Sequence, residues 1–283
     1  MAQILDGKQV VLSINADAKL RAKSLSDRGI TPTLAIIRVG DRGDDIAYER
    51  SAIHRCEAIG VAVKTFLLPC DCAQMTLLNT IEQINQDDAV HGCLLLRPLP
   101  RHMNDETVRS ALAPAKDIDG ITDGSLAGVF AGTPHGFPPC TARACIEILD
   151  YNGYQLKGKR AVVIGRSLVI GKPVAMMLLQ RHATVTICHT RTVGMPSVCR
   201  EADVLIVAAG RAGVVGADYT RAGQIVIDVG INLTAEGALC GDVDFAAVEP
   251  IAGAITPVPG GVGTVTTSVL VKQVIEAAER TLL

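Results

Sequence analysis

Two glycines flank a polar turn between a buried strand and a helix in the second half of the chain. Gly165 ends the apolar, β-branched run 161–164, and Gly171 precedes Lys172 and Pro173, where proline suits the first turn of a helix. Such a turn leaves backbone N–H groups and the positive end of the helix dipole free for a pyrophosphate. The spacing is not G-x-G-x-x-G, and a plain strand-to-helix connection is the alternative. We predict nucleotide binding at this turn.

The residues after the next strand indicate which dinucleotide binds. Strand 183–187 runs into the sequence C-H-T-R, which has no Asp or Glu to hold the ribose 2′-hydroxyl of NAD. The hydroxyl of Thr190 and the guanidinium of Arg191 suit a 2′-phosphate, and Arg166, next to Ser167 in the glycine turn, would be a second clamp. We therefore predict NADP rather than NAD. The alternative is that Arg191 is a solvated surface charge.

Three further segments have residue types that suit a planar, polar ligand. Tyr48 lies in the first turns of a predicted helix and would stack on or hydrogen-bond to a ring, although a half-buried core tyrosine fits equally well. Asp119 would hold a ring amide and amine, with a turn or capping aspartate as the alternative. The prolines and glycines of 257–263 fix a loop that another backbone or a ligand can approach closely. Ligands bind beyond the carboxyl ends of strands in open α/β sheets, so we expect these segments to converge on a cleft between two domains.

Alternating strands and helices position these residues. The predicted strands are 32–40, 61–68, 91–96, 161–164, 183–187, 204–208 and 224–229, and the predicted helices are 8–28, 44–59, 75–87, 107–112, 141–151, 174–179 and 267–283. This alternation is typical of parallel sheets covered by helices on both faces. A chain of 283 residues also exceeds a typical single core. We predict an α/β fold with two α/β domains: 1–140, completed by helix 267–283, and 141–266, a Rossmann-type dinucleotide-binding domain.

Composition excludes several classes of function. The net charge is −2 with both signs mixed along the chain, which argues against nucleic-acid and membrane-surface binding. No apolar run approaches the roughly 18 residues of a transmembrane helix, and the first residues do not resemble a secretory signal. The nine scattered cysteines indicate reduced thiols in a cytoplasmic protein. No metal site and no hydrolase nucleophile motif is found.

Ordered motifs along essentially the whole chain resemble one family, the bifunctional methylenetetrahydrofolate dehydrogenase/methenyltetrahydrofolate cyclohydrolases (FolD). The matching segments are 5–8, 34–60, 98–100, 116–120, 139–141, 163–167, 228–232, 241–244 and 256–263. The resemblance implies hydride transfer from methylenetetrahydrofolate to NADP, followed by hydration of the methenyl product to formyltetrahydrofolate. It also implies a homodimer in which domain 1–140 is the folate-binding catalytic domain.

The resemblance assigns roles to individual residues. Tyr48 matches the tyrosine that lines the folate site, and Asp119 matches the aspartate that holds the pterin. Arg166 and Thr190 match positions that contact the NADP phosphate. Within the same motifs we place Gly165, Ser167, Gly171, Arg191 and Ile231 in the cofactor site and Pro259, Gly260 and Gly261 in the substrate site.

Three positions depart from the family pattern. The family reads Y-x-x-x-K, and its lysine is the general acid/base, but here that position is Ala52. The family's V-Q-L-P-L-P has a glutamine that hydrogen-bonds this lysine, and here Leu96 replaces it. Losing both partners together leaves neither polar group unpaired. Thr264 stands where the family usually has proline.

The loss of the lysine and the glutamine affects the cyclohydrolase reaction, the hydration of the methenyl product. Hydride transfer depends mainly on positioning two rings, whereas hydration and ring opening need proton transfer. We therefore predict a dehydrogenase with weak or absent cyclohydrolase activity. The alternatives are a fully bifunctional enzyme in which Arg50, His54 or Arg55 substitutes for the lysine, a dehydrogenase for a modified pterin or another carbonyl substrate, and an inactive binding protein.

Overall fold

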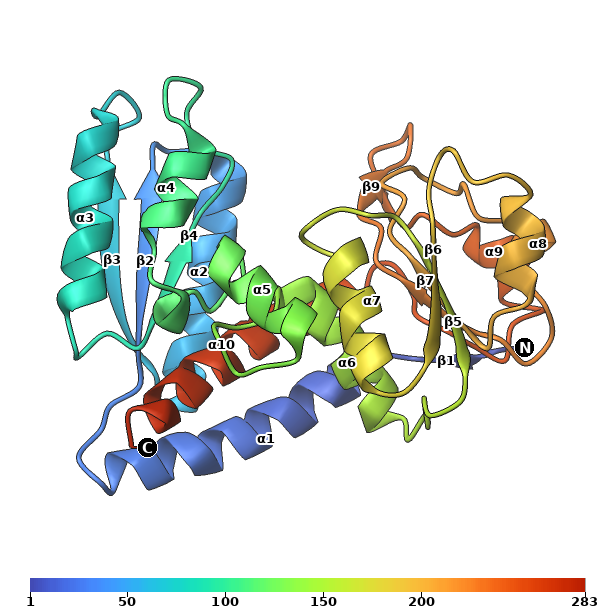
Figure 1. Cartoon of the computed structure of the whole chain (residues 1–283), viewed down its shortest axis with the longest axis horizontal. Helices are drawn as coiled ribbons and strands as arrows, with labels where there is room; N and C mark the ends of the chain where they lie inside the picture. Colours follow the sequence, from blue (N-terminus) through green and yellow to red (C-terminus); the bar gives the residue numbers. More distant parts are fainter. Residues whose placement is uncertain (283) are drawn as a thin grey trace. The chain divides into compact units, whose positions relative to one another are not determined.

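The structure is a computed structural model that describes residues 1–282, and it divides into two compact units (Figure 1). One unit is Met1–Leu12 with Thr141–Thr266, and the other is Ser13–Cys140 with Thr267–Leu283. Leu283, the last residue of the predicted helix 267–283, lies outside the described residues. Each unit has its own parallel sheet.

The first unit contains a six-stranded parallel sheet. Its strand order is β1 (Gln3–Ile4), β11 (Ala254–Ile255), β8 (Ile225–Asp228), β7 (Val204–Val207), β5 (Arg160–Ile164) and β6 (Thr184–Cys188). Strands β5, β7 and β8 are almost completely buried, as expected of β-branched runs covered on both faces. The other elements of this part of the chain are α6 (Cys140–Tyr151), α7 (Gly171–Gln180), α8 (Met195–Arg200), η2 (Ala217–Tyr219), α9 (Phe245–Val248) and the hairpin β9 (Asn232–Leu233)–β10 (Leu239–Cys240).

The second unit contains a three-stranded parallel sheet of order β3 (Ala62–Leu68), β2 (Thr33–Val39) and β4 (Gly92–Leu95). Ala35, Ile37 and Val39 form a core with α3 (Gln74–Gln86) and α4 (Asp105–Ala111), which lie beside the sheet in Figure 1. Side chains alternate along a strand, so Arg38 points to the opposite face, where it binds Glu49 of α2 (Gly43–Ile59). The remaining elements are η1 (Pro114–Lys116) and α5 (Asp123–Ala131), with α1 (Gly7–Ser26) and α10 (Val262–Arg280) contributing residues to both units.

The structure differs from the sequence-based prediction at the N-terminus. We assigned residues 1–12 to the first domain, but they belong to the unit that contains 141–266. The reason is that β1 pairs in parallel with β11, so that Gln3 lies opposite Ala254. A two-residue edge strand has no periodicity that a sequence analysis can detect.

Several helix boundaries also differ. Helix α10 begins at Val262 rather than at 267, so the end of the glycine-rich segment 257–263 is already helical. Helices α5 and α8 were not predicted. Two glycines within α5 weaken its helical pattern, and its start depends on the Thr122 side chain, which accepts a hydrogen bond from the Ser125 N–H.

Candidate active site

The turn after β5 is closed by two glycines that no other residue can replace. A Cβ at Gly165, whose φ is +121°, would lie 2.3 Å from the Ala208 carbonyl oxygen. A Cβ at Gly171 would lie 2.2 Å from the Gly165 carbonyl oxygen. Between them the Ser167 carbonyl accepts from the Lys172 N–H at 3.0 Å, and the Ser167 hydroxyl accepts from the Ile170 N–H at 3.2 Å. The chain therefore folds tightly at the start of α7, as a cradle for a pyrophosphate requires.

Two unpaired arginines lie on loops that start from adjacent strands. Ile164 of β5 pairs with Cys188 of β6, so the loops that carry Arg166 and Arg191 leave the same edge of the sheet. Both arginines are exposed, and neither guanidinium has a hydrogen bond or ion pair with any residue between 1 and 282. Thr190 is exposed beside Arg191. A tight glycine turn at the start of a helix, with unpaired cations on loops at the same edge of the sheet, fits a dinucleotide that carries an additional phosphate.

Two buried aspartates hold the neighbouring loops in place. Asp228, at the end of β8, accepts the N–H groups of Gly230 (2.9 Å), Asp242 (3.0 Å) and Val243 (3.0 Å). Burial raises the pKa of Asp228 to about 6, although these three N–H groups oppose the shift. Asp242 in turn accepts two backbone N–H bonds, from Gly210 and Arg211, each at 2.9 Å. We did not predict these roles.

The remaining residues predicted for this unit lie on the loops around this network. The Asn232 amide donates to Asp242 at 2.9 Å, and the preceding residue, Ile231, is 69% exposed. The loop that contains Pro259 and Gly260 is approached by a backbone, as its composition predicted: the Gly7 N–H donates to the Gly260 carbonyl at 2.8 Å, and Gly261 is buried. Pro259 is exposed and accessible to a ligand.

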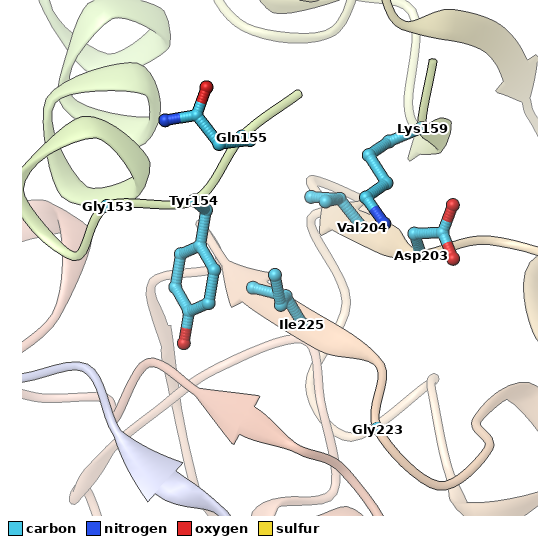
Figure 2. Close-up of a pocket in the computed structure, with 8 residues that line it drawn as sticks. All are labelled: Gly153, Tyr154, Gln155, Lys159, Asp203, Val204, Gly223 and Ile225. Carbon is cyan, nitrogen blue, oxygen red and sulfur yellow. The ribbon is translucent and has the colours of Figure 1, made fainter. Parts of the chain in front are cut away.

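A separate hollow of about 240 Å³ lies at the other end of this sheet (Figure 2). Asp203 and Gly223, which precede β7 and β8, belong to its lining, so the hollow lies at the amino ends of the strands. Tyr154 lies on one side of it, across from Lys159 and Asp203, and its hydroxyl donates to the Gln3 side chain at 3.3 Å. Because ligands of parallel α/β sheets bind at the carboxyl ends, the hollow is not part of the dinucleotide cradle.

In the second unit the structure brings Tyr48 and Asp119 together. Burial raises the pKa of Tyr48 well above its usual value, with further contributions from the charges of Asp119 and Cys140. Burial also raises the pKa of Asp119 to about 7, helped by the charge of Asp117 and opposed by the Cys140 thiol and by Arg97. Asp119 therefore lies in a poorly solvated place beside a tyrosine, which suits a carboxylate that accepts N–H groups from a planar ring.

Asp117, two residues earlier, has a structural role. It is fully buried and accepts the N–H groups of Ile121 at 3.0 Å and Thr122 at 2.7 Å. Its backbone bridges to Cys93 of β4 in parallel, so the loop continues from this point alongside the end of β4. Gln273 of α10 donates to the Ile118 carbonyl at 2.6 Å. These contacts fix the position of Asp119.

A buried ion pair holds α2, which carries Tyr48. Arg38 Nε donates to Glu49 at 2.6 Å, and both side chains are only 10% exposed. Arg38 Nη1 also donates to the Gly40 carbonyl and, at 2.6 Å, to Asp41. The pair fixes the helix one residue beyond Tyr48, and sequence analysis did not identify it.

The two positions where the family pattern changes are both buried. Ala52 is 0% exposed and Leu96 is 6% exposed, and neither has a side chain that can transfer a proton. Among the three residues suggested as replacements for the lysine, Arg50 and His54 are exposed and Arg55 is half-buried.

All nine cysteines are free, and no His/Cys/Asp/Glu group among residues 1–282 could hold a metal ion. None of the helices described is long and apolar enough to cross a membrane.

Comparisons with known proteins agree with this arrangement. Residues 5–119 match the catalytic domain of tetrahydrofolate dehydrogenase/cyclohydrolase, and residues 139–282 match its NAD(P)-binding domain. A relative from Carboxydothermus hydrogenoformans, named Bifunctional protein FolD, is 51% identical over 281 residues, which cover 99% of this chain and 98% of the relative.

Two solved structures extend the likeness to the fold. The bifunctional FolD enzyme of Campylobacter jejuni has a TM-score of 0.96 at 37% identity, with 99% of this chain and 100% of that chain covered. The Trypanosoma brucei enzyme, solved with NADP and an inhibitor, has a TM-score of 0.92 at 33% identity, with 99% and 98% covered. This chain therefore belongs to the tetrahydrofolate dehydrogenase/cyclohydrolase family, with a catalytic domain followed by an NAD(P)-binding domain.

Proposed function

We propose that this chain is an NADP-dependent methylenetetrahydrofolate dehydrogenase whose cyclohydrolase activity is weak or lost. The observation that carries the proposal is the burial of Ala52 and Leu96 at the positions of the family's lysine and glutamine. An apolar pair in a buried place leaves no polar group unsatisfied and provides no group that transfers a proton.

The residues retained in the site suit the dehydrogenase reaction. Asp119 accepts the ring N–H and amine of the pterin, and Tyr48 lies beside it to contact the ring. NADP, when bound, supplies the hydride acceptor, and the glycine cradle with Arg166, Thr190 and Arg191 would hold its phosphates. Hydride transfer depends mainly on holding the two reactants in the right geometry, and Ala52 and Leu96 do not prevent that.

Hydration of the methenyl product makes a different demand. Water must lose a proton and the ring nitrogen must gain one, and a correctly placed side chain typically contributes about 10²–10⁴-fold to such steps. The Tyr48 phenol, whose pKa is raised, stays protonated and cannot act as the base. The site therefore favours the first reaction over the second.

The alternative is a fully bifunctional enzyme, which is favoured by the name of the relative from Carboxydothermus hydrogenoformans. A dehydrogenase for a modified pterin is a further candidate, because replacing the lysine and glutamine changes the shape of the pocket. In each case we also propose a homodimer that acts on tetrahydrofolate derivatives in the cytoplasm, as the family resemblance implies.

Two absorbance assays on one purified preparation test the proposal. The first follows cofactor reduction by methylenetetrahydrofolate with NADP and then with NAD, and the second follows loss of methenyltetrahydrofolate. We expect reduction with NADP in preference to NAD, and methenyl loss close to the uncatalysed rate. Rapid methenyl hydrolysis would establish the bifunctional alternative, and no reduction with either cofactor would refute the dehydrogenase.

A further inference from the structure

A cation stands at the end of β4 where the family has an apolar residue. In the family pattern V-Q-L-P-L-P the residue after the glutamine is leucine, and here it is Arg97. The strand pairing continues to Leu96, whose N–H donates to the Ile37 carbonyl at 3.0 Å, and Arg97 follows at once. This chain therefore has Ala52 on α2 in place of the family's lysine and Arg97 after β4 in place of its leucine.

Arg97 is held firmly in place. Its Nε and Nη2 donate to the two carboxylate oxygens of Asp105 at 2.7 and 2.5 Å. The next residue is also held, because the Pro98 carbonyl accepts a hydrogen bond from Arg42 at 3.1 Å. A bidentate pair fixes the plane of the guanidinium, so little conformational freedom remains to be lost when a ligand binds.

One edge of the guanidinium is still available. The Arg97 Nη1 donates no hydrogen bond to any residue in the part of the chain that the structure describes, and the side chain is 31% exposed. Because Nε and Nη2 are bound to Asp105, the N–H groups of Nη1 point away from that carboxylate. Arg97 can therefore bind Asp105 and a ligand acceptor at the same time.

Arg97 and Asp119 follow two backbone segments that run alongside each other. The parallel bridge between Cys93 and Asp117 makes β4 and the loop after Asp117 run side by side in the same direction, toward Arg97 and Asp119. The charge of Arg97 reaches Asp119, since it lowers the pKa of that carboxyl against the stronger effect of burial. Arg97 therefore adds a hydrogen-bond donor to the part of this unit that carries the acceptor Asp119.

We propose that Arg97 is a positioning and specificity residue of the substrate site, whose Nη1 donates to the 4-oxo oxygen of the pterin while Asp119 accepts the adjacent N–H and amine. This inference rests on the proposed function, because it takes the substrate to be a folate. The pterin edge carries these groups side by side, so a fixed donor next to a fixed acceptor matches it. Arg97 remains charged and has no role in proton transfer, which is consistent with loss of the hydration step.

Four variants test the role of Arg97. In Arg97→Leu, which restores the family residue, we expect the Kd of tetrahydrofolate by calorimetry and the KM of methylenetetrahydrofolate to rise about tenfold, as loss of a charged hydrogen bond implies. The KM of NADP should stay within about twofold of wild type. Arg97→Lys should recover part of the loss, because the ammonium keeps the charge and a donor. Asp105→Asn, which loosens the guanidinium, should lie between Arg97→Leu and wild type.

Arg101→Leu is the matched control. It removes an exposed arginine four residues further along that has no partner among residues 1–282, and it should bind folate as the wild type does. The assignment is overturned if Arg97→Leu binds tetrahydrofolate as tightly as Arg101→Leu does. It is also overturned if folate and NADP binding weaken equally with a fall in Tm, because that result indicates a structural role.

The same measurements separate this inference from the proposed function. A wild-type chain that neither binds tetrahydrofolate nor oxidises methylenetetrahydrofolate refutes both. A wild-type chain that does both, with an unaffected Arg97→Leu variant, refutes only the assignment of Arg97.

Discussion

The Asp228–Asp242 cluster of the first unit and Asp119 of the second unit come from similar Asp- and Gly-containing motifs but differ in their hydrogen bonds. Asp228 accepts three backbone N–H groups, and Asp242 accepts two together with a side-chain amide. Asp119 accepts no backbone N–H group from the described residues, and burial raises its pKa to about 7. Buried structural groups have their hydrogen bonds satisfied, whereas Asp119 keeps acceptor capacity for a ligand. The number of backbone N–H groups that a buried carboxylate accepts thus distinguishes structural from ligand-binding aspartates, although their sequence motifs are similar.

The largest effect is expected on stability, from substitution of Asp228 in the Asp228–Asp242 cluster. Asp228→Ala leaves three buried backbone N–H groups without an acceptor, so we expect the free energy of unfolding to fall by about 3–5 kcal/mol. Urea denaturation followed by circular dichroism measures this change. Asp119→Ala is the matched control and should lower it by less than about 1 kcal/mol. Equal losses in the two variants would remove the distinction between Asp228 and Asp119.

The next largest effect is expected on folate binding, from substitution of Asp119. Asp119→Asn presents an amide to the two pterin donors, so we expect the KM of methylenetetrahydrofolate to rise about ten- to a hundredfold. The KM of NADP should not change. Steady-state kinetics with each substrate varied in turn measures both constants. A variant with wild-type KM values would show that Asp119 does not hold the substrate.

The raised pKa of Asp119 predicts two opposite pH dependences. Folate binding needs the ionised carboxylate, so the KM of methylenetetrahydrofolate should rise by up to about tenfold for each pH unit below 7. Stability changes in the other direction, because the folded pKa lies above the unfolded value of about 4. The contribution of Asp119 to the free energy of unfolding is complete below about pH 4 and is lost as the pH rises through about 7.

Asp119→Asn, whose side chain has nearly the same shape but does not ionise, tests the predicted pH dependence of stability. The Tm of Asp119→Asn relative to wild type should be higher at pH 8 than at pH 5, by about a few degrees. Taking the difference between the two proteins removes the contribution of Asp228, whose pKa is also raised. A Tm difference that does not vary with pH would mean that Asp119 titrates normally.

The smallest effect is expected at the dinucleotide cradle. Arg191 is exposed and solvated, so Arg191→Ala should weaken NADP binding by only about fivefold and leave NAD binding unchanged. Titration of each oxidised cofactor by calorimetry checks this difference. Equal weakening of NADP and NAD would mean that Arg191 does not contact the 2′-phosphate.

Local patterns predicted much of the fold and part of the site. The apolar runs of β5, β7 and β8 and the glycine turn before α7 depend on residues close in sequence, and they lie where the sequence placed them. The edge strand β1 could not be predicted, because it has only two residues and pairs with β11, about 250 residues further along the chain.

Long-range contacts explain what was missed in the site. The Asp228–Asp242 network and the Arg38–Glu49 pair join separate segments, and nothing in either segment alone indicates the partner. Arg50, His54 and Arg55, the residues that the sequence suggests in place of the lysine, all lie on α2. The influence of Arg97 on Asp119 depends on the bridge between β4 and the Asp117 loop, which joins segments far apart in the sequence.

The most direct test of the account measures methenyltetrahydrofolate hydrolysis by wild type and by Ala52→Lys/Leu96→Gln, side by side. Dehydrogenase activity and circular dichroism confirm that the double variant is folded. We predict that wild type hydrolyses at close to the uncatalysed rate, and that the restored pair accelerates hydrolysis by about a hundredfold. Wild-type hydrolysis as fast as its own dehydrogenase reaction would contradict the account, because a group other than the lysine would then transfer the proton.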